Sequence, residues 1–174
     1  MRRREILASA AGAIVSGCGY ALQGRGITTD ASVKRIGVPL FKDRTGKLGL
    51  DARITEAVVG ELLKRGRFTV VKEDTNVDAV VDGEITGWTA VPVNFSADTG
   101  LTQASRFSIL VSASVVYRKI GQKEPLWANE AFSQRDEYDM GENAQNYFDH
   151  ETQAIERLSS AFARNLVAAM LEAF

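Results

Sequence analysis

The most regular alternation of apolar and polar residues lies between residues 107 and 118. One set contains Phe107, Ile109, Val111, Ala113, Val115 and Tyr117, and the other contains Ser108, Leu110, Ser112, Ser114, Val116 and Arg118. A period of two predicts a half-buried antiparallel strand. Gly121-Gln122 then supplies a hairpin turn, and residues 125–137 are expected to return as the partner strand. The alternation is poorer in this partner, which predicts an edge strand or a bulge.

Two segments have a helical period instead. Apolar residues recur at spacings of three and four in the first, and its members are Leu50, Ile54, Ala57, Val58 and Leu62. This helix is expected to end at Gly66. The stripe of a long C-terminal helix consists of Ile155, Leu158, Phe162, Leu166 and Met170.

The first helix lies between two expected strands. Residues 34–41 form the earlier strand, with Ile36, Val38 and Leu40 on one face, and residues 42–49 form a polar loop. Residues 67–72 form the later strand. A strand, a helix and a strand at this spacing predict a βαβ unit with parallel strands and a right-handed crossover.

The remaining segments complete the predicted fold. Residues 78–89 read as a further strand, and residues 92–104 read as a loop of small and polar residues. The expected order is β-α-β-β-β-β-α, an α+β fold in which one mixed sheet is covered on one face by two helices. We expect a single domain over residues 32–174, preceded by a glycine-containing tether over residues 18–31.

The beginning of the chain carries an export pattern. Three arginines precede a mildly apolar run over residues 6–15, and Ser16-Gly17-Cys18 follows. The run is shorter than the roughly 20 residues that a membrane-spanning helix needs, so residues 1–17 read as a signal peptide. The paired arginines also resemble a twin-arginine signal, which leaves both general secretion and twin-arginine export open.

Cys18 is the only cysteine and lies at the expected cleavage point. The segment ending there resembles the bacterial lipobox, so Cys18 is expected to carry acyl chains that hold the protein on a membrane. Gly19 in place of an aspartate resembles an outer-membrane address.

Charge excludes one class of partner. The 21 basic and 22 acidic residues of the chain become 18 and 21 when Arg2, Arg3, Arg4 and Glu5 are removed with the signal peptide. A nearly balanced, slightly acidic protein gives no reason to expect nucleic acid as a partner.

Residues with catalytic or metal-binding chemistry are scarce. His150 is the only histidine, and its place before the C-terminal helix favours a solvated side chain. One histidine and one acylated cysteine do not make a zinc site. The acidic run Asp136, Glu137, Asp139 and Glu142 could hold calcium, but Tyr138 and Met140 occupy ligand positions of an EF-hand loop, which favours a solvated strand end. We therefore expect a binding or assembly protein with no cofactor, and not an enzyme.

Several segments together resemble the LptE family of lipopolysaccharide-assembly lipoproteins. They are Cys-Gly-Tyr-Ala-Leu at 18–22, Ile-Gly-Val-Pro-Leu-Phe-Lys-Asp-Arg-Thr at 36–45, the run 61–71 ending in Gly-Arg-Phe-Thr-Val-Val, Asp-Ala-Val-Val-Asp-Gly-Glu-Ile at 78–85, and Trp-Ala-Asn-Glu at 127–130. The resemblance covers essentially the whole mature chain and rests on their order and spacing.

The resemblance implies a non-catalytic outer-membrane lipoprotein. Such proteins plug the β-barrel LptD and help deliver lipopolysaccharide to the outer leaflet. By charge and loop position alone, the candidate lipopolysaccharide contacts are Lys42, Arg44, Lys47 and Arg106. The alternative is a subunit of an oligomeric secretion channel of the curli-export type, because those lipoproteins share the first βαβ pattern. A periplasmic enzyme is a third class, for which the sequence offers no catalytic constellation.

Overall fold

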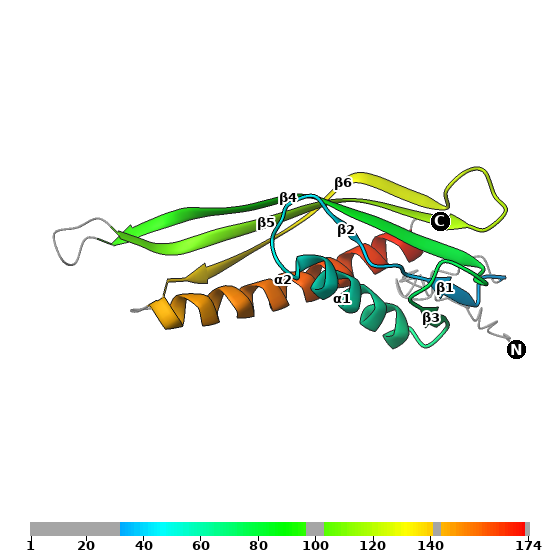
Figure 1. Ribbon diagram of the computed structural model, residues 1–174, viewed down its shortest axis with the longest axis horizontal. Helices are drawn as coiled ribbons and strands as arrows, with labels where there is room; N and C mark the ends of the chain where they lie inside the picture. Colours follow the sequence, from blue (N-terminus) through cyan, green and yellow to red (C-terminus); the bar gives the residue numbers. More distant parts are fainter. Residues whose placement is uncertain (1–31, 97–102, 141–143, 173–174) are drawn as a thin grey trace, which may run out of the picture.

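The computed structural model describes residues 32–96, 103–140 and 144–172 (Figure 1). It has one mixed sheet of six strands and two helices, which confirms the predicted α+β class. The elements are β1 (Arg35–Gly37), β2 (Lys42–Asp43), α1 (Leu50–Lys64), β3 (Thr69–Val71), β4 (Ala79–Ser96), β5 (Gln103–Lys119), β6 (Trp127–Asp139) and α2 (Ala144–Glu172). The proposed signal peptide, Cys18 and the tether lie outside the described residues.

The βαβ unit is confirmed. β1 lies between β3 and β4 and is parallel to both, with Ile36 opposite Val70 and Ala79. Of the strand expected over residues 34–41, only Arg35–Gly37 is strand, because Pro39 has no N–H for the sheet ladder. Beyond this break Leu40 is 60% exposed whereas Ile36 and Val38 are fully buried, so the prediction that the three share one face was wrong, and Phe41 is buried instead. The polar loop expected over residues 42–49 was also wrong at its beginning, since β2 lies there.

The hairpin of β4 and β5 is longer than predicted. β4 continues to Ser96 and β5 begins at Gln103, so the prediction of a loop over residues 92–104 was wrong at both ends. Pro92 pairs with Phe107, and the register shifts just beyond it. This part of β4 has no neighbour on its other side, since β2 pairs only with Glu84 and Ile85, and an edge tolerates proline.

β6 is the edge strand next to β5, as its poor alternation predicted. The pairing register shifts between Ala113 and Val115, which is the expected irregularity. Two backbone groups of β6 bond to side chains: the N–H of Ala131 donates to Asn129, and the carbonyl of Glu137 accepts from Arg157. Such capping protects an edge from strand addition.

Both helices lie under the same face of the sheet (Figure 1). All five apolar residues of the predicted C-terminal stripe are buried, and Phe162 packs edge-to-face on Phe132 with ring centroids 5.0 Å apart. At the other helix, the Thr55 hydroxyl accepts from the N–H of Phe41 at 3.0 Å, which satisfies a buried backbone donor after Pro39. Among the described residues, neither helix is long and apolar enough to cross a membrane.

Candidate binding surfaces

The four basic candidates do not form one cluster. Lys42 and Asp43 of β2 lie opposite Glu84 and Ile85 of β4, whereas Arg106 lies opposite Asn94. Ten residues of extended strand separate Glu84 from Asn94, which is roughly 30 Å at about 3.3 Å per residue. β5 is antiparallel to β4 and therefore to β1. Because β4 and β5 continue well beyond β2, Arg106 lies far along the sheet from Lys42.

Three of the four cations already have carboxylate partners. Arg44 binds Glu84 at 2.6 Å, and Lys47 binds Glu151 of α2 at 2.8 Å while it lies 5.2 Å from the centre of the Trp88 ring. The Lys47 side chain is 29% exposed. These pairs fix the loop between β2 and α1 against the sheet and α2. In the part of the chain that the structure describes, only Lys42 of the four has no ion-pair partner.

Arg106 joins the ends of β5 and β6. Its Nε donates to Asp139 at 2.8 Å, and Glu137 lies 4.0 Å away. The hydrogen bond from Arg106 lowers the pKa of Asp139, and the same bond raises the pKa of Arg106. His150 lies with Nδ1 2.8 Å from the Asp139 carbonyl, so it joins the beginning of α2 to this strand end. His150 lies within α2 and is partly buried, so its predicted place before that helix was wrong.

The acidic run is a strand end, as expected. Asp136 faces α2 and pairs with Arg157 at 3.0 Å, whereas Glu137 and Asp139 face the other side and approach Arg106. Alternate sides of a strand do not converge on one cation. No group of three metal-binding side chains occurs among the described residues, and Glu142 lies outside them.

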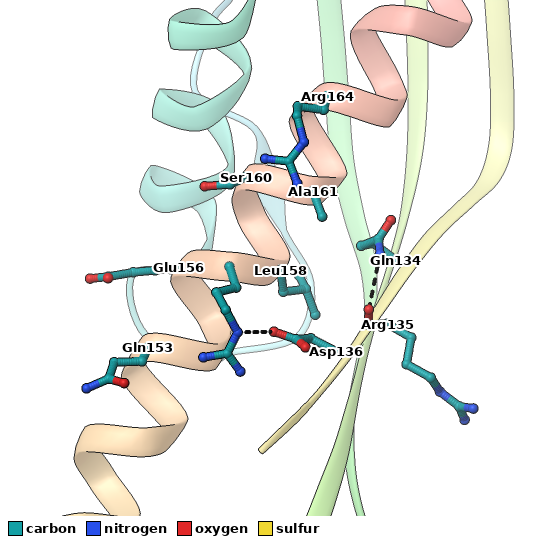
Figure 2. A pocket seen from close by; sticks show the side chains of 10 residues that line it. Gln134, Arg135, Asp136, Gln153, Glu156, Leu158, Ser160, Ala161 and Arg164 are labelled. Carbon is teal, nitrogen blue, oxygen red and sulfur yellow. Dashed lines mark hydrogen bonds and ion pairs between the residues drawn. The ribbon is translucent and has the colours of Figure 1, made fainter. Parts of the chain in front are cut away.

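A polar groove separates β6 from α2 (Figure 2). Its volume is about 660 Å³, and Arg157 and Arg164 line it from α2 while Gln134 and Asp136 line it from β6. Arg135 also lines it from β6 (Figure 2). The sequence analysis missed this groove, although Arg157 and Arg164 are seven residues apart and so share a helix face. Arg157 forms an ion pair with Asp136, and Asn165 donates a hydrogen bond to Gln134 at 2.8 Å. These polar groups therefore already have partners within the protein.

The second surface is the face of the sheet that the helices leave uncovered (Figure 1). We call it the open face, and we define it by five β5 residues and their neighbours in register: Ser108, Leu110, Ser112, Ser114 and Val116. Its centre is a row of small residues, Gly87, Ser112 and Ser133, on β4, β5 and β6. A hollow of about 540 Å³ lies toward β2, and its lining combines Leu40, Ser114 and Val116 with the charged residues Lys42, Asp74, Asp82 and Glu84.

Ion pairs mark both ends of the open face. Arg118 binds Asp82 at 3.0 Å at one end, and Arg106 binds Asp139 at the other. Between them, the Ser108 hydroxyl is buried, with the residue 2% exposed, and has no hydrogen-bond partner among the described residues. Val91 and Val93 of β4 are about two-fifths exposed. The alternation of β5 predicted a polar face, but not that the small row at its centre would lie between charged residues: Arg135 is opposite Leu110, and Glu84 is opposite Ser114.

Comparison with solved structures identifies the fold. A lipoprotein of Caulobacter crescentus aligns with a TM-score of 0.53 and 11% identity, over 78% of this chain and 87% of that chain. Rare lipoprotein B of Shewanella oneidensis aligns with a TM-score of 0.51 and 11% identity, over 79% and 93%. A PelC dodecamer from Paraburkholderia phytofirmans aligns with a TM-score of 0.52 and 9% identity, over 80% and 90%. At such identities these likenesses concern the fold alone.

The sequence itself decides the family. The comparison with curated proteins gives no match. The family model described as lipopolysaccharide-assembly, LptE, matches residues 33–170, a span that includes all six strands and nearly all of both helices. The protein therefore belongs to the LptE family of lipopolysaccharide-assembly proteins.

Proposed function

We propose that this protein is a non-catalytic outer-membrane lipoprotein, anchored through acyl chains on Cys18, that binds inside the LptD β-barrel and assists lipopolysaccharide assembly. The family match over residues 33–170 is the observation that carries the proposal. The lipobox-like segment before Cys18 supports the anchor. One acyl chain binds a membrane only marginally, so several chains on Cys18 would be needed for a permanent anchor.

Co-purification tests this function. The full-length protein is expressed in its own host and extracted in detergent, and its partner is identified by mass spectrometry. A one-to-one complex with the outer-membrane barrel is expected. A homo-oligomeric ring would instead favour the secretion-channel alternative, which the shared fold of the PelC dodecamer keeps as the competing outcome.

The anchor has its own test. Cys18→Ser removes the thiol that accepts the lipid, because a hydroxyl is a much poorer nucleophile than a thiolate. Labelled fatty acid should be absent from this variant, and the protein should leave the membrane fraction. Label that persists on the Cys18→Ser variant would contradict attachment at this residue.

Direct contact with lipopolysaccharide remains a proposal for Lys42, Arg44, Lys47 and Arg106. An exposed ion pair contributes about 0–1 kcal/mol and is weakened by salt, so single alanine variants should change little. Lys42→Glu is the sharpest single test, since this change breaks no ion pair among the described residues. The lipopolysaccharide affinity of this variant should be lower than that of the wild type at low salt, and the difference between the two should shrink as salt is added. Affinity equal to that of the wild type at low salt would remove Lys42 from the candidate contacts.

A further inference from the structure

We propose that the groove between β6 and α2 binds an extended, acidic peptide segment of a partner protein, which adds to β6 as a further strand. The inference goes beyond the proposed function, because neither lipopolysaccharide nor the barrel is needed for it. When a peptide adds to a sheet edge, main-chain hydrogen bonds supply the affinity and contacts of alternate side chains supply the specificity. The backbone of β6 and the charges of the groove offer both.

The first argument is the direction of the β6 backbone groups. In an antiparallel pair the N–H and C=O of one residue face the same way, and successive residues alternate between facing the partner strand and facing away. The carbonyls of Arg135 and Glu137 both accept hydrogen bonds from side chains, each at 3.1 Å, so these two residues face away from β5. Since the pairing with β5 has no register shift over residues 132–139, Ser133 faces away as well.

The second argument is the window that the caps of this edge leave open. The N–H groups of Ala131 and Glu137 donate to side chains of the same strand at 2.9 and 2.8 Å, which caps the edge at both positions. Between them, the N–H and C=O of Ser133 and the N–H of Arg135 face outward, and no side chain of the described residues bonds to them. These three groups can pair with a short peptide, whereas the caps prevent a longer strand from adding.

The third argument is the charge of the groove (Figure 2). The two acids of its lining are already paired with basic residues: Asp136 with Arg157, and Glu156 with Arg53. Arg135 and Arg164, which also line it, have no ion-pair partner in the described part of the chain. Arg164 belongs to α2 and Arg135 lies on the open face, so the two flank an added strand on both sides. Guanidinium groups bind carboxylates through charge-assisted bonds, which favours an acidic peptide.

Two substitutions separate backbone pairing from charge recognition. Ser133→Pro removes an outward N–H that does not bond to β5, and a sheet edge tolerates proline at such a position. Arg164→Glu reverses an unpaired charge of the groove, and Arg67→Glu makes the same change at an exposed residue that does not line it. The probe is a fluorescein-labelled peptide, Thr-Val-Glu-Val-Glu-Val-Thr, and fluorescence anisotropy measures its binding to the full-length protein in detergent.

The wild type should bind this peptide. Ser133→Pro should weaken binding about tenfold, since a main-chain hydrogen bond is lost. Arg164→Glu should weaken it about fivefold at low salt, and Arg67→Glu should leave it unchanged. A peptide that is N-methylated throughout, and one with lysine in place of both glutamates, should each bind more weakly than the original. If Ser133→Pro lowers the melting temperature, Arg164→Glu and the N-methylated peptide still decide, because neither alters the sheet.

Several results would overturn the proposal. They are no binding of the acidic peptide by the wild type, equal binding of the lysine peptide, and full affinity in a folded Ser133→Pro variant. A wild-type dimer that Ser133→Pro converts to a monomer would assign the edge to a second copy of this chain. Binding that appears only after residues 19–31 are deleted would assign it to that segment instead. None of these results depends on recovery of the barrel, so the proposed function is tested separately.

Discussion

The two faces of β5 differ in how deeply their side chains are buried. On the helix side, Ile109, Val111, Ala113 and Val115 are all fully buried. On the open face, Leu110, Ser112, Ser114 and Val116 are only partly buried, and Ser108 is covered but unpaired. The same strand therefore contributes stability mainly through one set of alternate residues, while most of the other set stays partly exposed. Substitutions on the two faces should have different consequences.

The largest expected effect is on the covered side. Phe162→Ala removes a fully buried ring that packs on Phe132, and truncation of a core phenylalanine costs about 3–5 kcal/mol. Phe148→Ala, on the same helix, removes a ring that is 61% exposed and should change stability by less than about 1 kcal/mol. Urea unfolding of both variants measures the difference. Equal losses would show that the core assigned to α2 is wrong.

A pair of glycines on β4 should give the next largest difference. An added Cβ at Gly83 would meet the ring of Phe41, which is buried and has little room to move, so Gly83→Ala should cost about 2–3 kcal/mol. At Gly87, on the open face, the nearest atom would be the Ser112 Cβ at 3.6 Å, an ordinary contact. Gly87→Ala should therefore leave the melting temperature unchanged or slightly higher. A loss at Gly87 equal to that at Gly83 would contradict the assignment of the two faces.

Neighbouring valines provide the strictest control, because they differ only in the face they occupy. Val115 is fully buried, and Val115→Ala removes two methyl groups from the core, so it should lower the free energy of unfolding by about 1.5–2 kcal/mol. Val116 is partly buried on the open face, and Val116→Ala should cost less than about 1 kcal/mol. The difference is read from the urea midpoints of the isolated protein.

The smallest expected effect concerns acid. Asp78 accepts hydrogen bonds from the backbone N–H groups of Lys34 and Arg35, both at 2.8 Å, and these bonds lower its pKa below 3.8. A carboxylate whose pKa is lower in the folded state contributes stability above its unfolded pKa and loses it as pH falls through the folded value. Asp78→Asn should therefore lower stability at neutral pH and flatten its decrease below about pH 4. An acid unfolding curve identical to that of the wild type would contradict this role.

The sequence determined the elements whose apolar pattern is strong and local. The alternation of β5, the two helical stripes and the parallel βαβ unit were all predictable, since each pattern records which side of an element meets the core. The sequence also supported the assignment to the LptE family, because the order and spacing of many short segments together indicate it although no single motif is diagnostic. Cys18 needs only the export pattern before it, and its role as the lipid attachment site stays a prediction.

The tertiary structure alone decided how surface residues combine. Residues 92–104 looked like a loop, but pairing with β5 makes residues 92–96 strand, because strand formation depends on the partner more than on local preference. The four basic candidates looked comparable in the sequence, yet three of them have carboxylate partners. Arg106 is also separated from Lys42 by roughly 30 Å along β4. Ion pairs such as Lys47 with Glu151 join residues about a hundred positions apart. Long-range pairing of this kind is set by strand order and register, which a linear pattern of charges does not contain.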